Sequence, residues 1–214
     1  MVSAKSMMMS GARLHVALLV SFLMILIWSG YRPADRFIWL LEVFPAIAGA
    51  AILVAIYPRT KLTALVYALI WLHAIVLMVG GHWTYAEVPL FDWLQSEYGL
   101  ARNYYDRVGH LFQGLVPAMI AREIFVRADV INGRRWRYFL VCCVALAISA
   151  LYEFLEWWVA VGTGTAADAF LATQGDVWDT QWDMFLALCG AILVQPLLGS
   201  WHDRQLSTLM TRAR

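Results

Sequence analysis

Charged residues are scarce in this sequence, and their scarcity excludes an ordinary soluble domain. They make up 14% of the 214 residues, whereas hydrophobic residues make up 62%; a soluble domain has about 25% charged residues. No linker or repeat interrupts the apolar stretches, which run along the whole chain. The composition therefore indicates a single membrane domain, residues 1–214, whose surroundings are the lipid bilayer. We expect no nucleic-acid partner.

Cysteine is also scarce, and its placement excludes two common uses of the residue. Cys142, Cys143 and Cys189 all lie within apolar stretches, at spacings that match neither a zinc knuckle nor a disulfide framework. We expect reduced thiols that pack among apolar side chains. No spacing matches a recognised zinc motif such as H-E-x-x-H, so no motif identifies a metal.

Six apolar segments are long enough to cross a membrane as helices, which takes about 20 residues. They are residues 14–30, 37–57, 62–80, 109–126, 138–161 and 183–201. The first is expected to be an anchor helix and not a signal peptide, because no convincing cleavage site follows it. The fourth contains Gln113, Pro117 and Arg122, which favours a helix packed within the bundle. The sequence thus predicts an all-α integral membrane protein, a six-helix transmembrane bundle.

Lys and Arg are distributed unevenly among the connections between these segments. With both termini in the cytoplasm, eleven of them lie inside and four outside, and the positive-inside rule selects this orientation. The acids show the opposite distribution, with twelve in the outer half or outside and three inside. Because acids contribute little to topology, their asymmetry needs another explanation. It predicts a polar site on the outer side.

Carboxylates and imidazoles gather at the outer ends of four of the segments. The candidates for catalysis are Asp106, His110, Glu153, Glu156, Asp176, Asp179 and Asp183, and the candidates for substrate binding are His82, Tyr85 and Glu87. Several pairs are three, four or seven residues apart and would share a helix face. An ionisable group next to hydrocarbon is costly unless it faces a protein interior, a wet cavity or a partner. The group therefore predicts a polar site inside the bundle.

These residue types are suited to two kinds of chemistry. Acids and imidazoles from several helices can hold a divalent metal. An acid-rich set favours Mg²⁺, Mn²⁺ or Ca²⁺, whereas His82 and His110 with one or two acids would suit Zn²⁺. The same groups can act as general acids and bases. The cofactor stays unknown, with a divalent metal as the candidate.

Some of these residues also have a purely structural explanation. Asp106 and Asp179 can cap the fourth and sixth segments at their N-termini. Arg102 and Arg107 can neutralise neighbouring acids, and His73 is expected to make a hydrogen bond between helices. The two glutamates of the fifth segment lie within a span, where neither capping nor solubility accounts for them. Glu153 and Glu156 are therefore the strongest evidence in the sequence for a functional site.

At these residues the chain resembles the YjdF-like family of uncharacterised bacterial inner-membrane proteins. The resemblance extends from residue 39 to residue 206, and its most specific parts are residues 81–91, 105–110, 152–158 and 173–184. Part of the same set, from Asp106 to Ala191, is similar to the VanZ-like family, some members of which are linked to glycopeptide antibiotic resistance. The resemblance implies a multi-pass protein of the bacterial inner membrane. Neither family supplies an established reaction.

Three functions fit the sequence. The first is a membrane-embedded hydrolase whose pocket opens outward and accepts a lipid or lipid-linked small-molecule substrate. The second is a non-catalytic envelope protein that binds cations or a partner. The third is a small cation- or proton-coupled transporter, but the sequence has no inverted repeat and no matching relay of acids on the inner side. The enzyme ranks first, the binding protein second and the transporter third.

Overall fold

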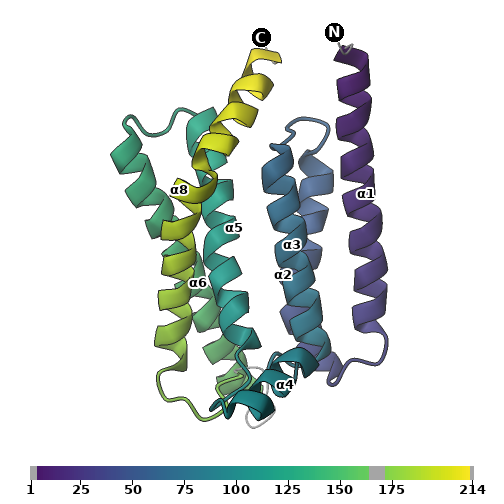
Figure 1. Cartoon of the computed structure of the whole chain (residues 1–214), viewed down its shortest axis with the longest axis vertical. Coiled ribbons are helices and arrows are strands. Elements are labelled where there is room, and N and C mark those ends of the chain that lie inside the picture. Colours follow the sequence, from purple (N-terminus) through teal and green to yellow (C-terminus); the bar gives the residue numbers. More distant parts are fainter. Residues whose placement is uncertain (1–3, 164–171, 213–214) are drawn as a thin grey trace.

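The computed structural model describes residues 4–163 and 172–212, which are helical with short connections and contain no strand (Figure 1). The helices are α1 (Ala4–Gly30), α2 (Arg36–Ile56), α3 (Ala64–His82), α4 (Pro89–Tyr98), α5 (Tyr105–Arg127), α6 (Arg134–Thr163) and α8 (Asp179–Arg212). Both termini lie at one end of the bundle, and the short helix α4 lies at the other end. The two ends differ in the polar groups that they bury.

Local sequence signals set several of the helix boundaries. Asp35 accepts hydrogen bonds from two backbone amides at the start of α2, and Thr63 accepts one at the start of α3. Such side chains satisfy amides that have no partner within the helix. Pro89 opens α4, and Gly99 ends it in the left-handed conformation that glycine adopts without strain.

Five of these helices are long and apolar enough to cross a membrane: α1, α2, α3, α6 and α8. The helix α5 has 23 residues but carries Gln113, Pro117 and Arg122, and 12 of its residues are buried, compared with four of 21 in α2. It is therefore the central helix, which needs little apolar surface toward lipid. The predicted all-α membrane fold is confirmed. The predicted count of six spans is not confirmed, because α5 is too polar to count as a sixth membrane-spanning helix by its composition.

The helices form two groups that meet at α3 and α5. In Figure 1, α1, α2 and α3 lie on one side, and α5, α6 and α8 lie on the other. The helices α1 and α2 pack on α3, whereas α6 and α8 pack on α5 and on each other. The main apolar core joins α3, α5, α6 and α8 through residues such as Val66, Met119, Ala145 and Val194.

Two glycines allow α5 and α8 to pack with their backbones in contact. A Cβ atom on Gly114 would lie 1.7 Å from the carbonyl oxygen of Ala187, and one on Gly190 would lie 2.2 Å from that of Leu111. Backbone atoms cannot move aside as a flexible side chain can. This close approach fixes the position of α8 against α5, and with it the position of the acids at the start of α8.

A polar network joins α3, α5 and α8 near the termini. Glu123 accepts hydrogen bonds from the backbone amide and hydroxyl of Thr63 at 3.0 and 2.8 Å and from Arg127 at 2.9 Å. His202 Nε2 lies 3.1 Å from Glu123, and Arg122 donates to His202 Nδ1 at 2.7 Å. Both oxygens of Glu123 have hydrogen-bond partners, so no oxygen is left to bind a ligand. We therefore interpret this network as structural: it holds α3, α5 and α8 together.

Replacing Gly114 by alanine should destabilise the protein by about 1–3 kcal/mol or more, because the added methyl group overpacks the contact between α5 and α8. The matched control is Gly11→Ala, where a Cβ atom would meet nothing within 4 Å and helix propensity increases. Thermal melting of the purified proteins in detergent measures the difference. Equal melting temperatures for the two variants would contradict this packing.

Candidate functional site

A fully buried asparagine fixes the segment that leads into α5 at the end opposite the termini. Asn103 Nδ2 donates to the Val88 carbonyl oxygen at 3.1 Å and to Asp92 Oδ1 at 2.7 Å. Its backbone amide and carbonyl both pair with the side-chain amide of Gln174 at 2.9 Å. Asn103 Oδ1 accepts from the backbone amide of Tyr105. These bonds hold the start of α5 against both flanking connections.

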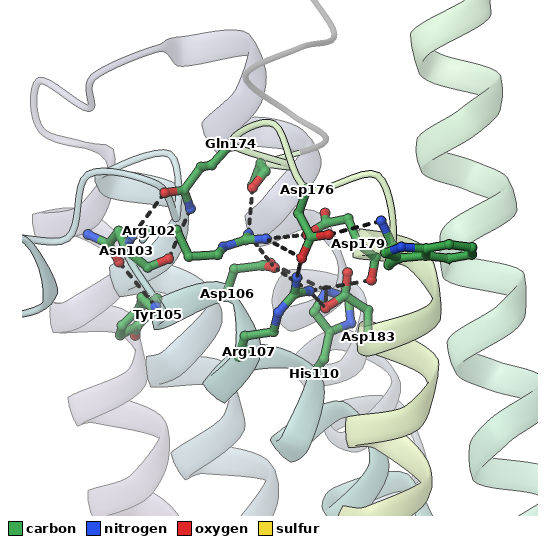
Figure 2. A network of polar contacts seen from close by, with 12 residues as sticks. Arg102, Asn103, Tyr105, Asp106, Arg107, His110, Gln174, Asp176, Asp179 and Asp183 are labelled. Carbon is green, nitrogen blue, oxygen red and sulfur yellow. Dashed lines mark hydrogen bonds and ion pairs between the residues drawn. The ribbon is translucent and has the colours of Figure 1, made fainter. Parts of the chain in front are cut away.

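Two buried arginines bind the three aspartates that precede and begin α8 (Figure 2). Arg107 donates to Asp176 at 3.0 Å, to Asp179 at 2.7 Å and to Asp183. Arg102 donates to the same Asp179 oxygen at 2.5 Å. Asp179 is thus held in an ion-paired cluster that crosses from α8 to α5. The arginines occupy the neutralising positions that the sequence suggested.

The edge of the His110 imidazole ring that carries Nε2 points toward this cluster. Its Nε2 atom lies 3.3 Å from Asp106 Oδ1, one turn earlier on α5, and 3.6 Å from Asp183 Oδ1 on α8. Both aspartates contact an arginine, since Arg107 Nη1 lies 3.6 Å from Asp106 and bonds to Asp183. On this side of the ring, the carboxylates have cationic partners.

The opposite nitrogen of the ring is directed toward α6. His110 Nδ1 lies 3.8 Å from Glu153 Oε1 and 2.9 Å from Gln113 Oε1. Glu156 lies one turn along α6, and one oxygen from each glutamate is within 4.8 Å of a His110 nitrogen and of the other. In the described part of the chain, neither glutamate pairs with an arginine or lysine. This side of the ring has carboxylates without cationic partners.

A cavity of about 240 Å³ begins at this polar cluster and extends between α2, α3, α5 and α6. Its polar lining residues are Glu42, His73, Tyr85, Asp106, His110, Gln113, Tyr152 and Glu156. Tyr152 donates to Glu42 Oε2 at 3.3 Å, from α6 to α2. The remaining lining is apolar and includes Pro45, Ile70, Pro117 and Ile148. The cavity therefore combines a polar end with an apolar body.

Tyr85, one of the three residues predicted to bind substrate, forms part of the cavity wall. Its ring packs closely on Gly80 and Gly109, where a Cβ atom would lie 2.3 and 2.9 Å from ring carbons. Burial, with a smaller effect of the nearby Glu42 carboxylate, holds the pKa of the Tyr85 phenol well above its ordinary value. The phenol is therefore a neutral hydroxyl that can donate a hydrogen bond.

The other two residues expected to bind substrate lie outside the cavity lining. His82 Nδ1 donates to the Ser29 carbonyl oxygen at 2.8 Å, and its ring stacks on Trp28 with centroids 4.8 Å apart. It therefore faces α1. Glu87 is exposed at the surface. Local spacing placed both near the site, but the packing of α1 on α3 turns His82 away from it.

The sequence analysis did not select three residues that line the cavity: Glu42, His73 and Tyr152. Glu42 carried a signal, because an acid within an otherwise apolar span is rare. The hydrogen bond expected for His73 is absent at Nε2, which is buried and has no partner among the described residues. Tyr152 carried no signal apart from its place beside Glu153.

The fold and the cavity define a multi-pass helical membrane protein with a buried cluster of acids around a histidine. Residues 14–204 match a family described as "Predicted membrane protein (DUF2238)". The chain is 55% identical over 183 residues to the inner membrane protein YjdF of Escherichia coli (strain K12), covering 86% of this chain and 88% of that one. No solved structure matches.

The chain therefore belongs to the DUF2238 family of membrane proteins. This membership confirms the resemblance to YjdF-like proteins, and together with the five apolar helices it supports a multi-pass protein of the bacterial inner membrane. Neither match supports the similarity to the VanZ-like family, which stays a prediction.

Replacing Arg107 by glutamine should destabilise the protein by about 3–5 kcal/mol, because buried carboxylates lose their partner. Adding Asp183→Asn should recover about 0.5–3 kcal/mol of that loss, since one unpaired charge is removed. Arg134→Gln, at an exposed position, is the control and should melt like wild type. Melting curves in detergent of wild type, both single variants, the double variant and the control test this coupling. A double variant with the sum of the single losses would contradict it.

Proposed function

We propose that this protein is a membrane-embedded hydrolase that acts on a lipid or lipid-linked substrate in the cavity beside His110. The observation that carries the proposal is the composition of that cavity: a histidine among buried acids at one end and an apolar body. A substrate with a polar head and an apolar tail matches both parts. A water-soluble substrate would leave the apolar walls without a role.

The polar end holds the groups that hydrolysis by acid and base catalysis requires. His110, oriented by Asp106 at 3.3 Å, would accept a proton from the attacking water. As the water oxygen bonds to the acyl or phosphoryl centre and the bond to the leaving oxygen breaks, Glu156 would donate a proton to that oxygen. The proton on His110 would then return to Glu156 and restore both groups for the next turnover. Tyr85 and Tyr152 would donate hydrogen bonds to the polar head.

The other predicted catalytic residues take different roles in this proposal. Asp176 and Asp179 are bound to arginines and would position α8 without taking part in proton transfer. Asp183, which contacts both Arg107 and His110, would orient the imidazole ring. Glu153 would remain beside His110 as a second acid.

Access to the cavity is proposed to be lateral, from the bilayer. The helices α2 and α6 both line the cavity, yet α2 packs mainly on α3, and α6 packs on α5 and α8. A lipid chain could therefore pass between α2 and α6. The site would face outward, because the connections rich in Lys and Arg, such as residues 57–63 and 128–135, lie at the end that carries the termini.

Turnover of native lipids tests the proposal. Purified protein is mixed with a total lipid extract of bacterial inner membrane, and products are identified by mass spectrometry. We expect a hydrolysis product with wild type and a loss of about 10²–10⁴-fold with His110→Gln or Glu156→Gln, as for the removal of an acid or base catalyst.

The control for this assay is Glu97→Gln, because Glu97 is exposed on α4. It should form product at the rate of wild type. No product from wild type, or equal rates for wild type and His110→Gln, would contradict a hydrolase at this site.

A second candidate function is non-catalytic binding of a cation. It is favoured by the excess of carboxylates over arginines in the cluster. The carboxylates are Glu42, Asp106, Glu153, Glu156, Asp176, Asp179 and Asp183, and the arginines that pair with them in the described residues are Arg102 and Arg107. Cation binding without turnover would favour this function over the hydrolase.

A further inference from the structure

We infer that the α6 side of His110 is a binding site for one divalent metal ion, with His110 Nδ1 and one carboxylate oxygen each from Glu153 and Glu156 as ligands. The three residues are buried, and one nitrogen of His110 and one oxygen of each glutamate lie within 4.8 Å of one another. This inference rests on the proposed function and deepens it: with the ion bound, His110 and Glu156 would be its ligands, and the ion would activate the attacking water and polarise the substrate in place of the proton transfers assigned to these two residues. Metal binding and turnover can nevertheless be measured separately.

The two sides of the imidazole differ in charge, and this difference selects the metal side. Asp106 lies 3.5 Å from Arg102, and Asp183 bonds to Arg107. A dication placed between those aspartates would be repelled by two guanidinium groups. Glu153 and Glu156 have no arginine or lysine partner in the described ranges, so a dication there would meet two carboxylates and no guanidinium group.

An unpaired oxygen atom points to the same place. Glu153 is 6% exposed, and its Oε1 atom is buried without a hydrogen-bond partner among residues 4–163 and 172–212. Leaving a buried carboxylate oxygen unpaired costs free energy, which a metal bond would offset. This atom lies 3.8 Å from His110 Nδ1, so one ion can reach both.

The hydrogen bonding of the ring also fits a metal ligand. Metal-bound histidines usually donate their second N–H group to a carboxylate, which fixes the tautomer. His110 Nε2 faces Asp106 Oδ1 at 3.3 Å. With the proton on Nε2, the lone pair of Nδ1 would be free for the ion, which would replace the hydrogen bond from Nδ1 to Gln113 Oε1. Asp106 then acts as the positioning residue of the site.

Gln113 is available as a fourth ligand. Its Oε1 atom lies 2.9 Å from His110 Nδ1, and adjacent ligands of one ion lie about 3 Å apart when each bond is about 2.1 Å long. Two carboxylates, one imidazole and an amide oxygen form a mixed nitrogen and oxygen set. Such sets suit Zn²⁺ or Mn²⁺. Either ion would act as a Lewis acid on a substrate oxygen.

Metal content of the purified full-length protein tests the inference. The protein is treated with a chelator, reloaded with Zn²⁺ or Mn²⁺ alone, desalted and measured by elemental mass spectrometry, and its melting temperature is recorded with and without metal. We expect about one ion per chain and a higher melting temperature with metal. The Glu153→Gln/Glu156→Gln variant should lose both effects.

Two further variants locate the ion. Asp106→Asn should keep the site but weaken binding by about 10–100-fold, as loss of a carboxylate behind a metal-bound histidine does. Glu97→Gln should bind like wild type. If the variants do not fold, X-ray absorption of zinc-loaded wild type provides the test: we expect one imidazole and oxygen ligands, and sulfur or several imidazoles would overturn the site.

Two other results would overturn the inference: wild type that retains no metal after desalting, or a Glu153→Gln/Glu156→Gln variant that retains metal while Asp183→Asn loses it. Turnover of lipid by metal-free protein that also binds no metal on reloading would overturn the metal site and leave the hydrolase standing. Stoichiometric metal without turnover of any lipid would support the site and contradict the hydrolase.

Discussion

The ion pairs between Arg107 and the aspartates at the start of α8 are the interaction on which the site depends. Arg107 lies on α5, one turn from His110, and contacts Asp176, Asp179 and Asp183. Buried ion pairs contribute little net stability compared with apolar residues, but they are costly to break. Their effect here is to fix which part of α8 faces His110. The glycine contact between the two helices sets the distance.

The arginines do not balance the acids that the fold brings together. Two guanidinium groups pair with the aspartates. Glu156 of α6 and Glu42 of α2 line the cavity, and Glu153 lies beside His110, all three without an arginine or lysine partner among the described residues. Burying carboxylates in this way is unfavourable unless protons, a cation or a substrate compensate. Glu42 and Glu156 belong to the polar end of the cavity, which is where the proposed function would place a lipid head group.

The class of the protein and part of the site follow directly from the sequence. A low charge content predicts a membrane protein, and an acid in an apolar helix stands out without any structure, as Glu153 and Glu156 do. The pairing of Asp106 with His110 follows from their spacing of four residues, since such residues share a helix face. These predictions need only local periodicity and composition.

The rest depends on packing between helices, which local spacing does not determine. Asp183 meets His110 only because Gly114 allows α8 to approach α5. His82 lies near the end of α3, but Trp28 and Ser29 of α1 bind its ring and keep it from the cavity. The polar residues of α5 indicated its central place in the bundle. They did not indicate which helices would pack against it.

The central claim is that His110 and the two glutamates of α6 form a cation site, because no arginine neutralises the charge of those glutamates. Anomalous X-ray diffraction from crystals of wild-type protein grown in lipid with Mn²⁺ tests it most directly. The account predicts one anomalous peak bonded to His110 Nδ1, Glu153 and Glu156. A crystal with no peak in the cavity, or with the peak between Asp106 and Asp183, would contradict it.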